Sequence, residues 1–245
     1  MEAIYLFYIL LFIVAFLYAS VGHGGASGYL ALMALFSITP EVMKPTALLL
    51  NLFVSLTAFI QFYRGKHFIW KIFLPLALAS VPMAFVGGLI PLHSYIYKRI
   101  LGVILLIPVI RFGILKDKNV AETKPHNVIV CVVIGAAIGF LSGLIGIGGG
   151  IILSPILLML SWTNQKQTAA ISALFIFVNS LSGLAGQLTT GIHFTGNMLL
   201  LVLIAFSGGL AGAYWGSLRF KQVVLKRVLA SVLFIAAYKL LFTHA

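Results

Sequence analysis

The stretch VGHGGASG at residues 21–28 interrupts an otherwise apolar part of the chain, and a second glycine-rich stretch, IGIGGG at residues 145–150, interrupts another. Each separates a longer apolar segment from a short one, at residues 27–38 and 151–161 respectively. Glycine lacks a β-carbon, so such runs interrupt helices and permit main-chain conformations with positive φ. Two similar interruptions in similar settings indicate that the chain consists of two related halves.

Composition assigns the class of protein. Hydrophobic residues make up 62 % of the 245 residues and charged residues only 8 %, whereas about a quarter of the residues in soluble domains are charged. The apolar segments are about 18 to 24 residues long, enough to cross a hydrocarbon core of about 30 Å as helices. Because the segments are continuously apolar, a β-barrel is excluded. We therefore predict an all-α polytopic membrane protein.

The net charge of +12 does not indicate a nucleic-acid partner, because Lys and Arg lie at the ends of the apolar segments, where they report topology. The one cysteine, Cys131, lies within an apolar segment, so neither an intrachain disulfide nor a cysteine-based metal site is expected. Glu2 precedes the first segment in place of a basic region, so we do not expect a removable signal peptide.

Five matching positions, in the same order, relate the two halves. Thr46-Ala47 matches Thr168-Ala169, for example, and the Gly-x-His-Phe turn at residues 65–68 matches the one at residues 191–194. We predict repeat 1 at residues 1–115, a cytoplasmic connector at 116–127 and repeat 2 at 128–245. The expected helices are residues 3–20, 27–38, 45–63, 68–90 and 95–114, followed by 128–145, 151–161, 168–189, 194–217 and 223–242.

The distribution of positive charge distinguishes inverted from parallel repeats. With about five segments per repeat, twelve of the sixteen Lys and Arg residues share one side, whereas four crossings per repeat divide them eight against eight. The positive-inside rule therefore favours two inverted repeats of five segments each, with both termini outside and the broken first helices meeting near the membrane midplane. The four exceptions that remain outside are Lys44, Lys98, Arg99 and Lys239.

Each short helix, at about 18 Å for about twelve residues, must begin inside the membrane if it ends at a surface. Its first main-chain N–H groups then require protein, water or an anion as acceptor, and the positive end of the helix dipole favours an anion. The other glycines, Gly87-Gly88, Gly208-Gly209, Gly212 and Gly216, are expected to serve close helix packing.

Polar side chains near the two stretches extend this expected anion site. They line the substrate path or, equally well, join helices through hydrogen bonds. His23 is the one titratable group in either stretch, and it is a candidate substrate ligand, proton carrier or main-chain cap. The expected substrate-binding residues are Gly22, His23, Gly24, Gly25, Ala26, Ser27, Gly146, Gly148, Gly149, Gly150, Asn51, Ser55, Ser172 and Asn179.

All four acidic residues lie near segment ends or in the connector. A carboxylate cation site or proton relay within the membrane is therefore not expected, nor is a metal or other cofactor. An intramembrane enzyme would need a catalytic dyad or an HExxH-like motif, and the sequence contains neither. We expect a protein that is not an enzyme.

The chain resembles the sulfite exporter family TauE/SafE, also described as toluene-sulfonate uptake permeases. The resemblance covers nearly the whole chain and rests on GFLSGLIGIGGG at residues 139–150, the looser VGHGGASG at 21–28, PxxxKPTA at 40–47 and the Gly-x-His-Phe turns. The first glycine stretch departs from the second, with His23 and Ala26 in place of Ile147 and Gly150. The resemblance implies transport of sulfur-containing anions such as sulfite or small organosulfonates, or of related organic acids.

We expect a secondary transporter in the cytoplasmic membrane of a prokaryote, with a small sulfur-containing anion and the lipid bilayer as partners. An inside-negative potential favours outward movement of a monoanion by about 2.3 kcal/mol per 100 mV, so export is preferred. An anion channel and a proton-coupled uptake permease for organic sulfonates or carboxylates are the alternatives. Whether the chain forms a homodimer stays open.

Overall fold

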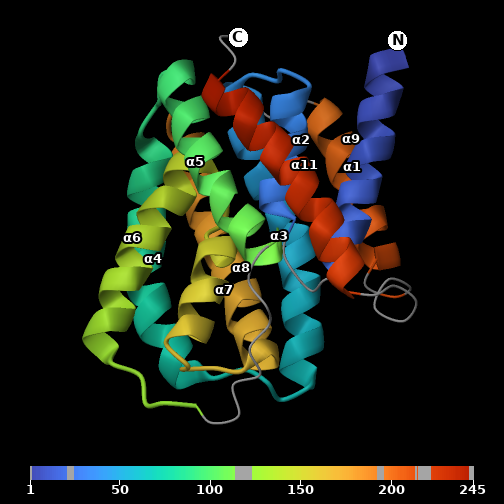
Figure 1. Cartoon of the computed structure of the whole chain (residues 1–245). Coiled ribbons are helices and arrows are strands. Elements are labelled where there is room, and N and C mark those ends of the chain that lie inside the picture. The colour runs from blue at the N-terminus through green and yellow to red at the C-terminus, as the bar shows by residue number, and fades with distance from the viewer. Residues whose placement is uncertain are drawn as a thin grey trace.

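The computed structural model describes residues 2–20, 25–113, 123–191, 196–212, 214 and 222–242. Its elements are helices, and the described residues contain no strand, which confirms the all-α fold class. Figure 1 shows the helices gathered into a bundle. They are α1 Glu2–Ser20, α2 Ala26–Leu35, α3 Pro40–Arg64, α4 Trp70–Leu89, α5 Ser94–Gly113, α6 Val128–Ile145, α7 Gly150–Met159, α8 Gln165–Leu188, α9 Gly196–Ala211 and α11 Gln222–Phe242.

The bundle has the surface of a membrane protein. Helices α3, α4, α6 and α8 are each long and apolar enough to cross a bilayer. Large apolar side chains face outward from them, with Leu78 on α4 73 % exposed and Ile129 on α6 74 % exposed. Exposed apolar surface of this extent is costly in water and is matched by hydrocarbon.

Two helices, α2 and α7, are much shorter than the others. Each contains 10 residues and is therefore about 15 Å long, half the thickness of a hydrocarbon core. In Figure 1, α2 lies toward the end of the bundle where both termini are found, and α7 lies toward the opposite end. The expected short helices are present, and they lie toward opposite ends of the bundle.

The packing of the helices has a two-fold pattern. If α1 to α5 correspond in order to α6, α7, α8, α9 and α11, most contacts recur: α4 packs on α6 as α9 packs on α1, and α4 packs on α8 as α9 packs on α3. Likewise, α11 contacts α2 as α5 contacts α7. The corresponding helices α3 and α8 contact each other across the centre, and so do the corresponding helices α5 and α11. This pattern supports two related halves, and the inverted orientation of the repeats stays a prediction.

Glycines let several helices pack main chain against main chain. On α6, glycines four residues apart face carbonyl oxygens of α4, and on the other side of the bundle Gly208 and Gly212 face the carbonyls of Phe12 and Phe16 on α1. A Cβ at any of them would collide with the facing carbonyl, as in other close-packed membrane helices. The α4–α6 contacts are Gly135 with Leu76, Gly139 with Ser80 and Gly143 with Ala84.

The expected packing role is therefore confirmed for Gly208 and Gly212, and also for Gly87 and Gly88, which approach main-chain atoms of α6 and α8. Gly209 is buried, and a Cβ there would lie 3.7 Å from Val54 Cγ2, an ordinary contact, so the packing at that position does not require the absence of a side chain. Gly216 lies outside the described residues.

Helix bounds differ from the expected ones mainly at the starts of α3 and α8 and at the end of α2, which comes three residues earlier than expected. Pro40 occupies the first turn of α3, where its missing N–H costs no hydrogen bond, and the helix continues through Pro45. Helix α8 begins three residues earlier than expected because Asn164 and Gln167 form a capping box.

Candidate functional site

The second glycine stretch forms the turn between α6 and α7. Gly146, Gly148 and Gly149 have φ of 90°, 72° and 78°, a region that side-chain-bearing residues rarely adopt. Gly146 ends α6 through its N–H, which donates to the Ser142 carbonyl at 2.8 Å, and Gly149 is the N-cap of α7. The glycines therefore set a main-chain shape that aims the start of α7 into the bundle.

The start of α7 is buried and has no side-chain cap among the residues that the structure describes. Gly149 cannot supply a capping side chain, and both Gly150 and Ile151 are buried. Main-chain N–H groups in the first turn of a helix have no intrahelical acceptor four residues back. Ile152 and Leu153 donate to the Gly149 carbonyl, which leaves the N–H groups of Gly150 and Ile151 as donors at the positive end of the helix dipole.

Asn51 on α3 and Ser180 on α8 lie against this turn. Asn51 is fully buried, and its Nδ2 donates to Ser180 Oγ at 3.3 Å. A Cβ on Gly148 would lie 2.8 Å from Asn51 Nδ2, 2.8 Å from Ile176 Cγ2 and 3.1 Å from Ser180 Oγ. The main chain at Gly148 thus touches polar groups of two different helices.

Several polar atoms in this region are buried without a hydrogen-bond partner among the described residues. They include Asn51 Oδ1, Ser55 Oγ and Asn179 Oδ1, with Ser142 Oγ at the end of α6. Buried polar atoms in native structures are nearly always paired, so unpaired ones on α3, α6 and α8, the helices that contact the turn before α7, indicate a place for a polar ligand or water. We refer to Asn51, Ser55, Ser142, Asn179 and Ser180 as the inner polar cluster.

Two of the serines expected to bind substrate form hydrogen bonds that join neighbouring helices. Ser172 Oγ shares a hydrogen bond of 2.9 Å with Ser154 Oγ, which also donates to the Gly150 carbonyl at 2.8 Å. Ser27 Oγ shares one of 2.7 Å with the Tyr18 hydroxyl and so ties α2 to α1. These contacts hold the starts of α7 and α2 in place.

The structure describes only part of the first glycine stretch. Gly22, His23 and Gly24 lie outside the described residues. Gly25 is the N-cap of α2, its carbonyl accepts from the Tyr29 N–H at 2.9 Å, and a Cβ there would collide with the Tyr29 ring. Ala26 and Ser27 form the buried first turn of α2.

Sequence reasoning missed Ser180, Ser142, Ser154 and Tyr97. Ser180 follows Asn179 directly and Ser142 lies within the quoted glycine motif, so proximity to those signals could have identified both. Nothing local identifies Tyr97, whose hydroxyl donates across the bundle to the Ile145 carbonyl at 2.9 Å and satisfies the end of α6.

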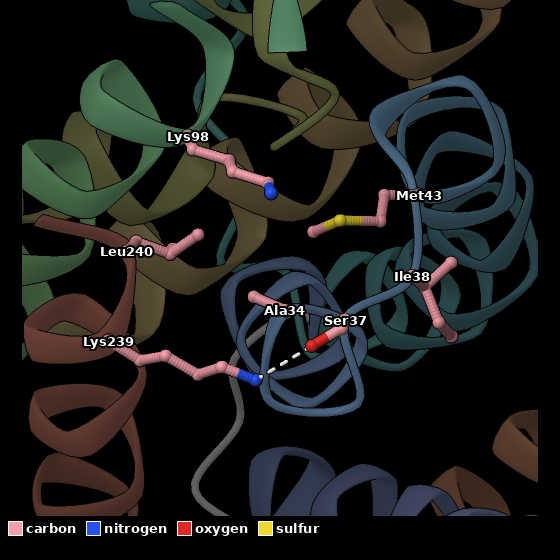
Figure 2. Close-up of a pocket in the computed structure, with 7 residues that line it drawn as sticks. All are labelled: Ala34, Ser37, Ile38, Met43, Lys98, Lys239 and Leu240. Carbon is pink, nitrogen blue, oxygen red and sulfur yellow. Dashed lines mark hydrogen bonds between the residues drawn. The ribbon is translucent and has the colours of Figure 1, made fainter. Parts of the chain in front are cut away.

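At the other end of α2 the structure contains an open pocket, shown in Figure 2. Lys239 Nζ donates to the Leu35 carbonyl at 2.7 Å and to Ser37 Oγ at 3.0 Å, and Lys98 points into the pocket. Lys239 therefore caps the negative end of α2. The pocket is lined by Ala34, Ser37, Ile38, Met43, Lys98, Lys239 and Leu240.

Positively charged side chains that the predicted topology places on the outside of the membrane also make contacts within the protein. Lys44 Nζ donates to the carbonyl of Ile90, the C-cap residue of α4, at 3.4 Å, as Lys239 does at the end of α2. The Arg99 guanidinium lies over the Tyr95 ring, 5.1 Å from its centroid. Lys44 and Lys239 are therefore engaged with helix ends, which gives them a structural role besides any influence on topology.

A buried, uncapped helix start among polar side chains, inside an apolar helical bundle, is the architecture of a multi-pass membrane transporter. The family model of the Sulfite exporter TauE/SafE proteins matches residues 7–240. The chain belongs to this family of membrane transporters. The expectation of a membrane transporter, and not an enzyme, is confirmed by that membership and by the relatives' names.

The chain is 34 % identical to the "Probable membrane transporter protein y4hK" of Sinorhizobium fredii, over 94 % of this chain and 95 % of that protein. It is 28 % identical to the "Probable membrane transporter protein YdhB" of Bacillus subtilis, over 93 % and 94 %. The "Sulfite exporter TauE/SafE family protein 1" of Arabidopsis thaliana is 30 % identical over 45 % of this chain and 24 % of that protein. No solved structure matches the chain.

Proposed function

We propose that the protein is a secondary transporter that exports sulfur-containing anions, such as sulfite or small organosulfonates, and holds the anion on main-chain N–H groups of its two glycine-rich stretches. The observation that carries this proposal is the buried start of α7, where Gly150 and Ile151 present N–H groups that no side chain of the described residues caps. The names given to the family and its plant relative support sulfite as a substrate.

The surroundings suit an anion. Ser180 Oγ accepts a hydrogen bond from Asn51, so the Ser180 O–H remains a donor beside Gly148. In the inner polar cluster the donors are neutral, and none of its members is an acidic side chain that would repel an anion. With α2 arranged as the counterpart of α7, Gly22 to Ser27 would complete the site from the other repeat.

The transport experiment uses the full chain in proteoliposomes loaded with sulfite. An inside-negative potential should drive sulfite out, because it favours outward movement of a monoanion. Absence of potential-dependent release of every sulfur oxyanion and sulfonate tested would reject the proposal. Single-channel conductance would instead identify an anion channel, and uptake that requires an inward proton gradient would identify a proton-coupled permease.

The site experiment compares two positive-φ glycines. Gly148→Val places a side chain against Asn51, Ile176 and Ser180, whereas Gly191→Val adds one where no atom of the described residues lies within 4 Å of the Cβ. Sulfite binding measured by calorimetry should be abolished in the first variant and retained in the second. Unchanged affinity in Gly148→Val would show that the anion does not bind at the start of α7.

A further inference from the structure

The amide of Asn179, on α8, presents an oxygen that accepts no hydrogen bond from the described residues. The side chain is fully buried, and its Nδ2 donates to the Phe175 carbonyl at 2.8 Å. The Phe175 carbonyl can only accept a hydrogen bond, so exchanging the positions of Nδ2 and Oδ1 in the Asn179 amide would lose this bond. Oδ1 therefore faces away from its own helix, and it has no partner within the described part of the chain.

Asn179 belongs to the face of α8 that packs on the second glycine stretch. At about 100° per residue, Phe175 lies about 40° to one side of Asn179 and Ile176 about 60° to the other. A Cβ on Gly149 would lie 2.9 Å from the Phe175 ring, and one on Gly148 would lie 2.8 Å from Ile176. Asn179 thus lies between two residues that contact the turn before α7.

A second unpaired acceptor comes from the opposite helix. Asn51 on α3 is fully buried, its Nδ2 donates to Ser180 Oγ beside Gly148, and its Oδ1 is unpaired among the described residues. The region therefore offers main-chain N–H donors on one element and amide oxygen acceptors on two others. A ligand with acceptors only, such as a fully deprotonated oxyanion, satisfies the first set and not the second.

We infer that the transported anion carries its own hydrogen-bond donor, an O–H or N–H group, which binds Asn179 Oδ1 while the charged oxygens bind the start of α7. This inference rests on the proposed function and narrows its substrate class to hydroxylated, amino-substituted or monoprotonated sulfur oxyanions. Discrimination follows because an analogue without the donor leaves a buried acceptor unpaired.

The test uses a matched pair of ligands, ethanesulfonate and 2-hydroxyethanesulfonate, which differ by one hydroxyl group. Calorimetric affinities are measured on the purified full-length protein. We expect the hydroxylated sulfonate to bind about tenfold more tightly, the contribution of about one hydrogen bond. The ratio of affinities should fall to about one in Asn179→Leu and in the smaller substitution Asn179→Ser.

Ser182→Ala is the control on the same helix, because the Ser182 hydroxyl donates to the Val81 carbonyl of α4 at 2.6 Å; it should keep the tenfold ratio. Equal affinities of the wild type for both sulfonates would overturn the inference and leave the proposed function standing, with water as the partner of Asn179. Binding of neither sulfonate would overturn both the inference and the proposed function. A tenfold ratio that persists in both Asn179 variants would also overturn the inference.

Discussion

Gly148 combines two demands that only glycine meets. Its φ of 72° disfavours any side chain, and the space a Cβ would occupy is taken by Asn51 and Ile176. Gly191 shares the first demand without the second, because its φ is 85° and, within the described part of the chain, no atom lies within 4 Å of a Cβ there. The pair separates the cost of strained backbone from the cost of crowding.

Gly191→Ala should lower the free energy of unfolding by about 1 kcal/mol, the cost of a left-handed conformation at a non-glycine residue. Gly148→Ala should cost about 2 to 4 kcal/mol, because the crowded Cβ adds to the same strain. Thermal unfolding in detergent measures both. Equal losses would show that the region around Gly148 relaxes freely.

Tyr97 holds the end of α6 through its hydroxyl. Tyr97→Phe removes the donor to the buried Ile145 carbonyl and should destabilise the protein by about 1 to 3 kcal/mol. Tyr95→Phe, on the exposed surface of the same helix, should change stability little. Thermal unfolding distinguishes the two, and a silent Tyr97→Phe would mean that water replaces the hydroxyl.

The sequence predicts individual site residues unevenly. The glycines are evident because their repetition is visible, and Asn51 and Asn179 are evident because an amide is rare in an apolar helix. Ser172 and Ser27 carry the same signal, yet their hydroxyls are already bonded to Ser154 and Tyr18. Whether a buried hydroxyl is engaged or unpaired depends on neighbours distant in sequence, which periodicity does not report.

At the scale of elements, the C-terminal end of the short helix α2 is capped by a side chain from a distant part of the chain. Lys239, from the last helix, donates to the Leu35 carbonyl 204 residues away in the chain. The positive charge also opposes the negative end of the helix dipole. One side chain thus joins the last helix, α11, to the short helix α2.

Lys239→Met keeps much of the aliphatic stem but removes the capping ammonium, and it should cost about 1 kcal/mol. Lys71→Met, in the exposed first turn of α4, should be neutral or slightly stabilising, because a cation is unfavourable at a helix start. Unfolding midpoints of the two variants measure the difference. The reverse order would contradict a capping role for Lys239.

The α4–α6 contact depends on the absence of side chains. Gly139→Ala would push a methyl group into the Ser80 carbonyl and should destabilise the protein by about 2 to 3 kcal/mol. Ala137→Leu, on the exposed face of α6, should be tolerated despite its larger volume. Thermal stability and detergent-resistant folding report both variants, and a tolerated Gly139→Ala would require that the helices separate easily.

The existence and order of the helices were predictable because the long apolar segments suffice for a membrane crossing and end at polar residues, while glycine-rich stretches set off the two short ones. The start of α3 was not, because the expected helix began at residue 45, although Pro40 is compatible with the first turn of a helix. The partners of each helix were also not predictable. They depend on which glycines face which carbonyls.

At the scale of the whole molecule, the recurrence of helix contacts indicates two related halves, and labelling can establish their orientation. The turns after α3 and α8 occupy corresponding positions, so inverted repeats place Lys66 and Thr190 on opposite sides of the membrane. In the cysteine-free background Cys131→Ala, Lys66→Cys should resist an impermeant maleimide in intact cells and Thr190→Cys should react. Reaction of both, or of neither, would indicate parallel repeats.

The glycine contacts of α4 with α6 and of α9 with α1 restrict how such a protein can move. Helices that touch through their main chains fit in a single register, because a slip of one residue would drive a Cβ into a carbonyl group. Each pair of helices should therefore move as one rigid unit. Opening toward either side of the membrane would then bend or tilt these helix pairs about contacts made by side chains, such as those of α5 with α11. The helices of a pair would not slide along their glycine contacts.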